Sequence, residues 1–479
     1  MVTLTLPDQW APCTLDAAIS HNGLISDGDW IESKDQDPSG SVRLIQLADI
    51  GDGEFRNKSQ RYMSPQKALA LNCTYLKKGD VLIARMPDPL GRACLFPNIN
   101  QPAVTVVDIC LIRVSNESAI NNRLLKYWIN SPEFRSLMDQ NASGTTRKRI
   151  TRKKLETFEI PLPPLVEQKV IADKLDELLA QVDTLKARLD AIPAILKRFR
   201  QSVLAAAVSG KLTEEWRGYT EEYLHEHSKK WLWGSIPQTW QAELYPEVVN
   251  SRLGKMLDKA KNSGEPTPYL GNINVRWLHF DLTNLQKILV NPNELSELSV
   301  QSGDVLICEG GEPGRCAIWH ESYGNKIIFQ KALHRARVSD RLTPEWLVLN
   351  IKNDADNQTL QQLFTGTTIK HLTGKALKQY PIRLPPIEEQ TEIVRRVEQL
   401  FTYADQVEQQ VKNAQARVNQ LTQSILAKAF RGELTEQWRQ DNPELISGDN
   451  SAAALLERIK AERAAAKPAK KTKGRKSDA

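Results

Sequence analysis

One stretch of this chain occurs twice. Residues 160–217 and 382–439 align without a gap at an offset of 222 residues, and 21 of the 58 aligned pairs are identical. Each copy opens with an LPP-x-x-EQ motif and closes with Trp-Arg. The repeat period is far too long for a solenoid. The repeat therefore predicts a duplicated module that has two parts.

Apolar residues in both copies recur at alternating steps of four and three. This 3.5-residue period predicts two helices that pair as a coiled coil, and a long amphipathic helix lying on a globular core is the alternative. The predicted interface comprises Ile171, Leu175, Leu178, Val182, Leu185 and Leu189 in the first copy, and Ile393, Val397, Leu400, Val407, Val411 and Val418 in the second.

The ends of both predicted helices carry matching signals. A Pro-Pro pair precedes each copy and suits a helix entry, and Gly210 and Gly432 are placed to end the helices. Pro193 interrupts the first copy. Because the apolar period continues through it in register, we expect a kink there and not a helix end.

Length and composition indicate a cytoplasmic protein of two or more domains. The chain has 479 residues, of which 41% are hydrophobic, enough for real cores. Its six cysteines form no CxxC pair, which favours reduced, buried thiols. The first residues lack the pattern of a signal peptide, and no apolar run approaches the ~18 residues of a membrane helix.

The net charge of +6 is concentrated at the end of the chain. Residues 467–479 carry a net charge of +5, so the rest of the chain is nearly neutral. This tail predicts a disordered basic arm after a helix near 451–466. Two roles stay open for it, non-specific contact with phosphates and improved solubility.

Each repeat follows a region with weak helical periodicity and short β-branched runs. We expect strands at Val42–Leu47, Asp80–Arg85 and Val104–Val114, and at Asp304–Cys308 and Lys326–Gln330. Helices are expected at Arg123–Asp139 and Pro344–Phe364. The predicted divisions of the chain are 1–159, 160–217, 218–381, 382–439 and 440–479.

The two regions share a frame but differ between its landmarks. A Gly-Asp-Val-Leu-Ile segment begins at Gly79 and at Gly303, and a Gly-Arg pair follows each segment. Each region closes with Gly-Thr-Thr, at 144–146 and 366–368. The sequence thus predicts two domains of similar fold with different surfaces.

No catalytic motif stands out. We find no N/D-P-P-Y/F motif, no glycine-rich loop suited to S-adenosylmethionine and no GxxxxGK[ST]. The glycine-rich segment 310–315 lacks the Lys-Ser/Thr of a phosphate loop and favours a turn. His225 and His227 have no partner at a metal-binding spacing.

The ordered duplication resembles the specificity subunits of type I restriction–modification systems. Any one motif is weak, but the LPP-x-x-EQ, Gly-Thr-Thr and GDVL-I elements recur in order over nearly the whole chain. The resemblance implies an α+β fold, in which two α/β target-recognition domains are separated by two long helices forming an antiparallel coiled coil with an internal pseudo-twofold repeat. It also implies a non-catalytic protein that reads a bipartite, asymmetric site in double-stranded DNA.

The resemblance implies partners as well. They are two modification subunits that methylate adenine with S-adenosylmethionine, and restriction subunits driven by ATP with Mg; this chain itself is expected to hold no cofactor. Helices of about 40 residues span ~60 Å and would set the distance between the half-sites. Residues 211–217 and 433–439 are candidate docking surfaces, with helix capping and packing as the alternative.

A basic run at 147–154 is the strongest local signal for DNA, because six of its eight residues are Lys or Arg. A solvated loop is the alternative, and structural ion pairs would explain the isolated arginines equally well. The predicted DNA-binding residues are Arg85, Arg92, Arg147, Lys148, Arg149, Arg152, Lys153, Arg276, Arg315 and Lys370.

Two rival functions stay open at this point. A coiled-coil adaptor that holds two protein-binding modules apart would explain the helices, but it explains two divergent modules in one frame less naturally. A nuclease fused to a DNA reader is the second rival, and the missing motifs argue against it.

Overall fold

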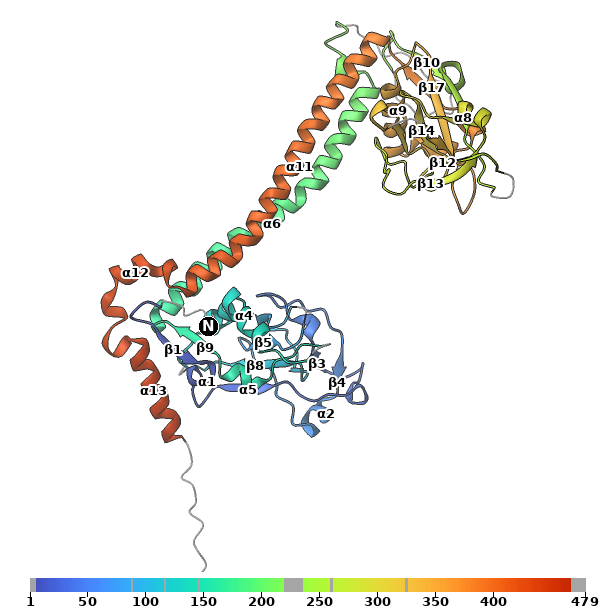
Figure 1. Cartoon of the computed structure of the whole chain (residues 1–479). Helices are drawn as coiled ribbons and strands as arrows, with labels where there is room; N and C mark the ends of the chain where they lie inside the picture. The colour runs from blue at the N-terminus through green and yellow to red at the C-terminus, as the bar shows by residue number, and fades with distance from the viewer. Residues whose placement is uncertain are drawn as a thin grey trace, which may run out of the picture. The chain divides into compact units, whose positions relative to one another are not determined.

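The computed structural model describes residues 6–87, 89–115, 118–144, 147–218, 236–258, 262–323 and 326–466. His225, His227 and the basic tail lie outside these residues. The chain divides into two units: unit 1 comprises residues 1–188 and 414–479, and unit 2 comprises residues 189–413 (Figure 1).

The described residues of unit 1 form three small sheets. The four-stranded sheet has the order β2-β8-β5-β6 and the three-stranded sheet the order β4-β3-β7, while β1 pairs with β9. The strands are β1 (Ala11–Thr14), β2 (Leu24–Asp27), β3 (Val42–Ile45), β4 (Tyr62–Met63), β5 (Val81–Ala84), β6 (Ala93–Leu95), β7 (Ala103–Thr105), β8 (Ile109–Arg113) and β9 (Glu159–Leu162).

Unit 2 repeats these sheets with the same connections. Its sheets have the orders β11-β17-β14-β15, β13-β12-β16 and β10-β18. The strands are β10 (Gln241–Leu244), β11 (Val249–Leu253), β12 (Glu265–Leu270), β13 (Gln286–Val290), β14 (Val305–Cys308), β15 (Cys316–Ile318), β16 (Ile328–Phe329), β17 (Leu333–Val338) and β18 (Pro381–Leu384).

The helices complete both units. The short ones are α1 (Leu15–Ala18), α2 (Pro65–Ala70), α3 (Asn122–Ile129), α4 (Pro132–Asn141), α5 (Arg152–Glu156), α7 (Tyr245–Val248), α8 (Pro292–Leu298), α9 (Pro344–Asp356), α10 (Gly374–Leu377), α12 (Glu436–Asp441) and α13 (Ala452–Ala465). The two long helices, α6 (Leu165–Val208) and α11 (Ile387–Phe430), have 44 residues each.

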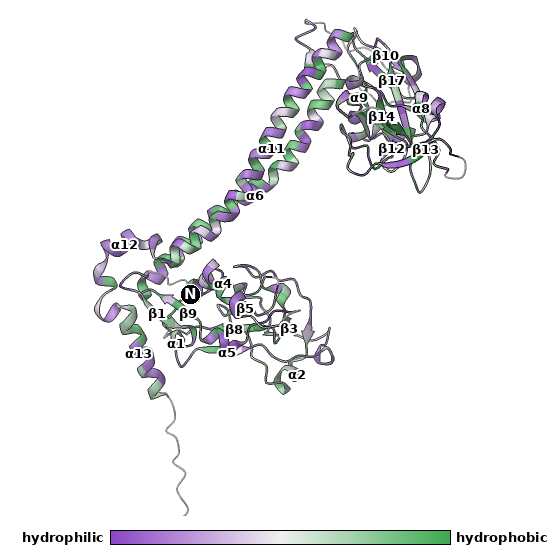
Figure 2. Ribbon diagram, in the orientation of Figure 1, coloured by the Kyte–Doolittle hydropathy of each residue, from purple (hydrophilic) through white to green (hydrophobic). Residues whose placement is uncertain are grey.

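The long helices pack against each other in antiparallel directions within both units. In unit 1, Lys174 near the start of α6 donates to the carbonyl of Leu434, just beyond the end of α11. In unit 2, Arg200 near the end of α6 pairs with Asp405 at 2.5 Å in the first half of α11. Apolar and polar residues alternate along both helices, as the period predicted (Figure 2). α6 continues through Pro193, so the prediction that the helix does not end there is confirmed.

Three predicted elements are each interrupted in the structure. The predicted strand Val104–Val114 is wrong as a single strand, because a turn at 107–108 separates β7 from β8 and places them in different sheets. The predicted helix Arg123–Asp139 is divided into α3 and α4, because Ser131 caps a new helix that has Pro132 in its first turn. Pro344–Phe364 likewise ends as an α-helix at Asp356, and a 3-10 turn follows.

The large core of unit 1 joins the sheets to both long helices. Trp128 and Phe430 lie edge to face with ring centroids 4.8 Å apart, and Ile171 and Leu175 of α6 are fully buried beside them. The expected helix near 451–466 is α13, and it packs against α1 through Leu455, Leu456 and Ile459 (Figure 1). This packing has no counterpart among the described residues of unit 2.

Candidate DNA interface and helix joints

A buried carboxylate joins three segments in unit 1. Glu167, from the first EQ motif, is completely buried and accepts hydrogen bonds from the Trp10 indole at 2.8 Å and the Thr435 hydroxyl at 2.6 Å. The Arg439 guanidinium pairs with the same carboxylate at 2.7 Å. Buried charges are stable only when they are paired and hydrogen-bonded, and here both conditions are met. We call this cluster joint 1.

Unit 2 contains the same cluster, which we call joint 2. Glu389 accepts from the Trp240 indole at 2.9 Å and from the Thr213 hydroxyl at 2.8 Å, and it pairs with Arg217. In both joints the tryptophan comes from the start of a domain, the glutamate from the start of one long helix, and the Thr and Arg from the segment after the other. The joints therefore explain why the EQ and Thr-x-x-x-Arg elements are duplicated together.

The glutamine of each EQ motif holds its own domain. Gln168 Oε1 accepts from the backbone N–H of Asn121, the cap of α3, at 2.7 Å. Gln390 Oε1 accepts in the same way from Thr343, the cap of α9, at 2.9 Å. Each side-chain amide also donates to two backbone carbonyls. The two residues of each motif thus make different contacts. The Glu binds the segment that follows the other long helix, and the Gln binds the domain next to its own helix.

The predicted seam is largely buried. The side chains of Ile171, Leu175, Val182, Ile393, Val397 and Val411 are 0–6% exposed. Leu178, Leu189, Leu400, Val407 and Val418 are half-buried. Leu185 is the exception, with 45% of its side chain exposed.

Several predicted DNA-binding arginines are engaged inside the protein. Arg85 pairs with Asp27 at 2.6 Å, and its side chain is only 4% exposed. Arg92 donates to the carbonyls of Leu47 and Ile50. Arg315 donates to the Asn272 carbonyl at 2.8 Å and pairs with Glu312 at 2.9 Å. Because Arg92 and Arg315 hold equivalent loops in the two units, a structural role accounts for both.

The remaining candidates reach solvent to different degrees. Arg147, Lys148, Lys153, Arg276 and Lys370 are exposed. Arg276 lies 3.5 Å from Asp281. Arg149 lies 3.7 Å from Asp108, and Arg152 lies within 3.4 Å of Asp27 and Glu156. Arg147, Lys148, Lys153 and Lys370 are thus the exposed candidates for which the described residues provide no ion-pair partner.

Sequence reasoning missed two exposed isoleucines near the Gly-Thr-Thr loop of unit 2. Ile273 is 64% exposed and Ile369 is 66% exposed. Isoleucine carries no charge, so a pattern of basic residues does not point to these two positions. The offset of 222 residues, which aligns Ile369 with Arg147, was the signal that could have revealed one of them.

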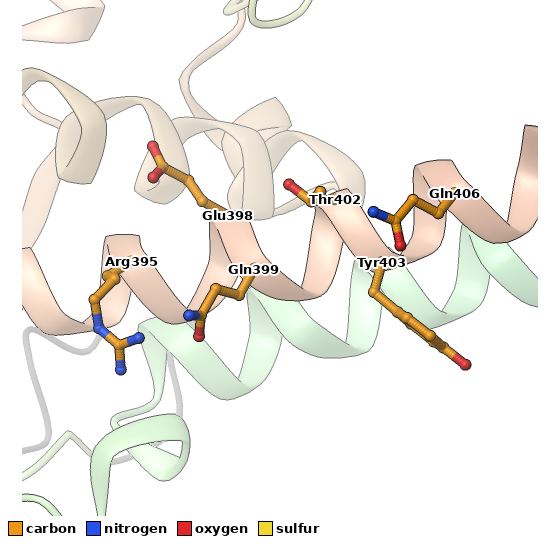
Figure 3. A pocket seen from close by; sticks show the side chains of 6 residues that line it. All are labelled: Arg395, Glu398, Gln399, Thr402, Tyr403 and Gln406. Carbon is orange, nitrogen blue, oxygen red and sulfur yellow. The ribbon is translucent and has the colours of Figure 1, made fainter.

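A shallow hollow lies on one face of α11 in unit 2. Its lining residues are Arg395, Glu398, Gln399, Thr402, Tyr403 and Gln406, which follow one another at helical spacing (Figure 3). Among the described residues no group of three His, Cys, Asp or Glu side chains is arranged to hold a metal ion. No described helix is long and apolar enough to cross a membrane.

Comparison with known proteins defines the class of the chain. The family described as the type I restriction modification DNA specificity domain matches residues 25–194 and 237–415. The EcoBI specificity subunit of Escherichia coli is 41% identical over 475 residues, covering 96% of this chain and 94% of that protein. The EcoKI specificity subunit of Escherichia coli strain K12 is 43% identical over 354 residues, covering 73% of each chain.

Solved structures show the same fold. The HsdS subunit from Thermoanaerobacter tengcongensis superimposes with a TM-score of 0.59 at 20% identity, covering 89% of this chain and 98% of that one. A chain from a study of assembly and conformational transition of the type I R-M system gives 0.60 at 20% identity, covering 89% and 99%.

The chain belongs to the specificity subunits of type I restriction–modification systems. It is a non-catalytic subunit that recognises the DNA target sequence within the complex. The expected α+β architecture, with two α/β domains and two long helices packed together, is confirmed.

Proposed function

We propose that the chain reads a bipartite, asymmetric DNA site, with one half-site for each unit. The observation that carries this proposal is the contrast between the joints and the loops. Joints 1 and 2 match residue for residue, whereas the exposed loop residues differ between units. Two like frames with unlike surfaces suit two different half-sites, and dimeric DNA readers use paired frames in a similar way. The spacer role of α6 and α11 stays part of this proposal.

Methylome sequencing tests the proposal. The host carrying this chain and its neighbouring methyltransferase is compared with a strain lacking this chain alone. We expect an asymmetric split motif, methylated on adenine in both halves and lost on deletion. Methylation that is unchanged, with the methyltransferase shown to be active, would contradict the proposal and favour the adaptor.

The exposed cations are proposed to bind phosphates. Arg147, Lys148 and Lys153 of unit 1 and Lys370 of unit 2 are exposed, and no described residue forms an ion pair with them. Removing one phosphate-binding side chain should weaken binding to all sequences and make the slope of log affinity against log salt less negative by about 0.9. Alanine variants of Arg147 and Lys148 test this, with Lys460→Ala on α13 as a control that already pairs with Glu457.

The chain is part of a type I restriction–modification complex, and we propose that it acts in the cytoplasm with two modification subunits and the restriction subunits. The duplication of the joints supports two equivalent docking surfaces at 211–217 and 433–439. In these segments the Thr and Arg serve the joints, but Trp216 is 45% exposed and Trp438 is half-buried. Native mass spectrometry of the purified complex should give two modification subunits per chain, and Trp216→Ala should favour loss of one.

A further inference from the structure

The residues that flank the Gly-Thr-Thr sequence form the same backbone hydrogen-bonded frame in both units. In unit 2 the backbones of Thr365 and His371 exchange two hydrogen bonds of 2.8 and 2.9 Å, and in unit 1 Ser143 and Arg149 exchange two of 2.9 and 2.8 Å. Gly366 has a φ of 91°, and a Cβ there would lie 2.2 Å from the carbonyl of Ile369. Only glycine fits this loop without strain. The loop therefore presents the residues at its tip in a fixed position.

A second loop lies beside this frame in unit 2. The Leu372 N–H donates to the carbonyl of Glu309 at 2.7 Å, and the Asn272 side chain donates to the carbonyl of Gly310 at 3.0 Å. A Cβ on Gly310 would lie 3.0 Å from the His371 ring. The loop that carries Ile273 and the loop that carries Ile369 are therefore held against the same short segment.

Unit 1 contains the equivalent pair of loops. The Ile150 N–H donates to the carbonyl of Arg85, as Leu372 does to Glu309. The Gln46 N–H donates to Asp49 at 2.8 Å, and the Gly271 N–H donates to Asn274 at 2.9 Å. This register makes residue 48 the counterpart of residue 273.

The side chains presented by the two frames differ in chemistry. Unit 2 exposes Ile273 and Ile369, and Lys370 follows Ile369 in the chain. At the matching positions unit 1 exposes the small Ala48 and the cation Arg147, and Lys148 follows Arg147. The lysine is common to both frames, whereas the tip residue is apolar in one unit and charged in the other.

The charged residues around the two isoleucines are of both signs. Of the two acids on the 309–315 segment, Glu309 is half-buried, and Glu312 is paired with Arg315 and accepts a hydrogen bond from the Trp277 indole at 2.6 Å. Lys370 adds a positive charge at the tip. An apolar tip beside a lysine therefore suits the edge of a base pair flanked by phosphates.

Resting on the proposed function, we infer that Ile273 and Ile369 contact thymine methyl groups in the major groove of the second half-site. The thymine 5-methyl is the apolar group that a base pair offers there, and an arginine favours guanine instead. The equivalent position in unit 1, Arg147, contacts a phosphate from the same frame, as proposed above. Residue 369 thus determines specificity on a scaffold whose counterpart in unit 1 serves a phosphate contact.

Substitution of thymine by deoxyuridine tests the inference directly, because uracil lacks only the methyl group. The full chain, purified with its modification subunits, is measured against its own target with single uracils in the second half-site. We expect uracil at one or two positions to weaken binding by wild type roughly fourfold, because burial of about one methyl group is lost. Ile369→Ala or Ile273→Ala should lose a similar factor on the thymine target and show no further loss with uracil at its partner position.

Controls separate this effect from a general one. Ile369→Val should keep most of the methyl sensitivity, and Leu289→Ala, an exposed leucine on β13, should leave affinity and methyl sensitivity unchanged. The slope of affinity against salt should stay at the wild-type value in Ile369→Ala, because no phosphate contact is removed. Uracil substitutions in the first half-site should act equally on wild type and both alanine variants.

Two results would overturn the inference. One is a wild type indifferent to every uracil in the second half-site, and the other is an equal loss with uracil in wild type and in both alanine variants. In either case specific binding of wild type to the split site would leave the proposed function intact. A wild-type complex with no preference for a split site would instead reject the proposed function itself.

Discussion

In unit 1, α3 meets the end of α11 through aromatic rings, whereas unit 2 places a buried ion pair in the corresponding region. Trp128 packs on Phe430, and Phe158 packs on Phe134. At the positions aligned with Trp128 and Phe158, unit 2 has Asn350 and Tyr380.

The buried group of unit 2 is fully connected. Arg383 pairs with Asp354 at 2.9 Å, and neither side chain is more than 5% exposed. The Tyr380 hydroxyl donates to Asp354 at 3.0 Å, and Asn350 accepts from Arg383 at 3.1 Å. The repeats therefore share the joint at the helix ends, whereas the residues packed behind it differ in chemistry.

Breaking the joints should have the largest effect, and the same effect in both units. Glu167→Ala and Glu389→Ala each leave a buried arginine without its carboxylate, which costs about 3–5 kcal/mol. Urea unfolding, with hydrogen exchange assigning the loss to a unit, measures it. Glu433→Ala, at an exposed surface pair with Arg431, is the matched control and should change stability by less than ~1 kcal/mol. If one of the two alanine variants kept wild-type stability, the two joints would not be equivalent.

Removal of one partner from the buried ion pair should destabilise unit 2 alone. Asp354→Asn leaves Arg383 uncompensated and should cost about 3 kcal/mol, while the double variant Asp354→Leu, Arg383→Met should recover most of the loss. Asp356→Asn, on the same helix and in a more exposed pair with Lys352, is the control. Thermal unfolding gives the difference. A double variant as unstable as the single one would argue that the pair specifies the fold of this unit.

The two units should respond to pH with opposite sign. Burial raises the pKa of Asp29 in unit 1 to about 6, so its folded form binds more protons and stability is lost as pH rises from about 4 through 6. Burial lowers the pKa of His334 in unit 2 below its ordinary 6.5, so stability is lost as pH falls below that value. Hydrogen exchange from pH 4.5 to 7.5 distinguishes the units. Asp29→Asn and His334→Gln should each flatten the response of one unit only.

The smallest effect is expected at the outer contact between α3 and α6. In unit 1, Arg123 pairs with Asp173 at 2.8 Å and also with Asp176. Unit 2 lacks this contact, because the aligned residues are Glu345, Arg395 and Glu398, and Arg395 pairs with Glu392. Because the Arg123 side chain is 31% exposed, Arg123→Ala should cost no more than ~1 kcal/mol. Glu345→Ala should cost less still. A loss above ~2 kcal/mol in the unfolding of Arg123→Ala would show that this contact also holds the domain.

The repeated parts of the fold could be predicted from the sequence, because the period of the apolar residues indicates which side chains are buried. The 3.5-residue seam predicted α6 and α11, and the duplicated EQ motif marked the joints without saying what they bind. The partner of Glu167 is Arg439, which lies 272 residues away, and no local pattern shows such a contact. The break between α3 and α4 was missed although Ser131-Pro132 is a helix-start signal.

The candidate site was harder to predict, because charge alone does not tell a DNA contact from an internal one. Arg85 and Arg92 are basic residues next to strands, as a DNA contact would be. In the folded chain, however, Arg85 binds Asp27 and Arg92 binds backbone carbonyls. Ile273 and Ile369 carry no charge, so their exposure on loops of the folded chain, and for Ile369 also its alignment with Arg147, is what distinguishes them. Exposure depends on tertiary packing, which sequence patterns report weakly for loops.

Exchange of one domain shows whether each unit reads its own half-site. Residues 1–159 are replaced by the corresponding region of another specificity subunit, and the methylome of the host is sequenced with the same modification subunit. If each unit reads its own half-site, the first half of the motif changes while the second half and its methylated adenine persist. Loss or change of both halves, in a chain that still assembles with its modification subunits, would contradict independent reading by the two units.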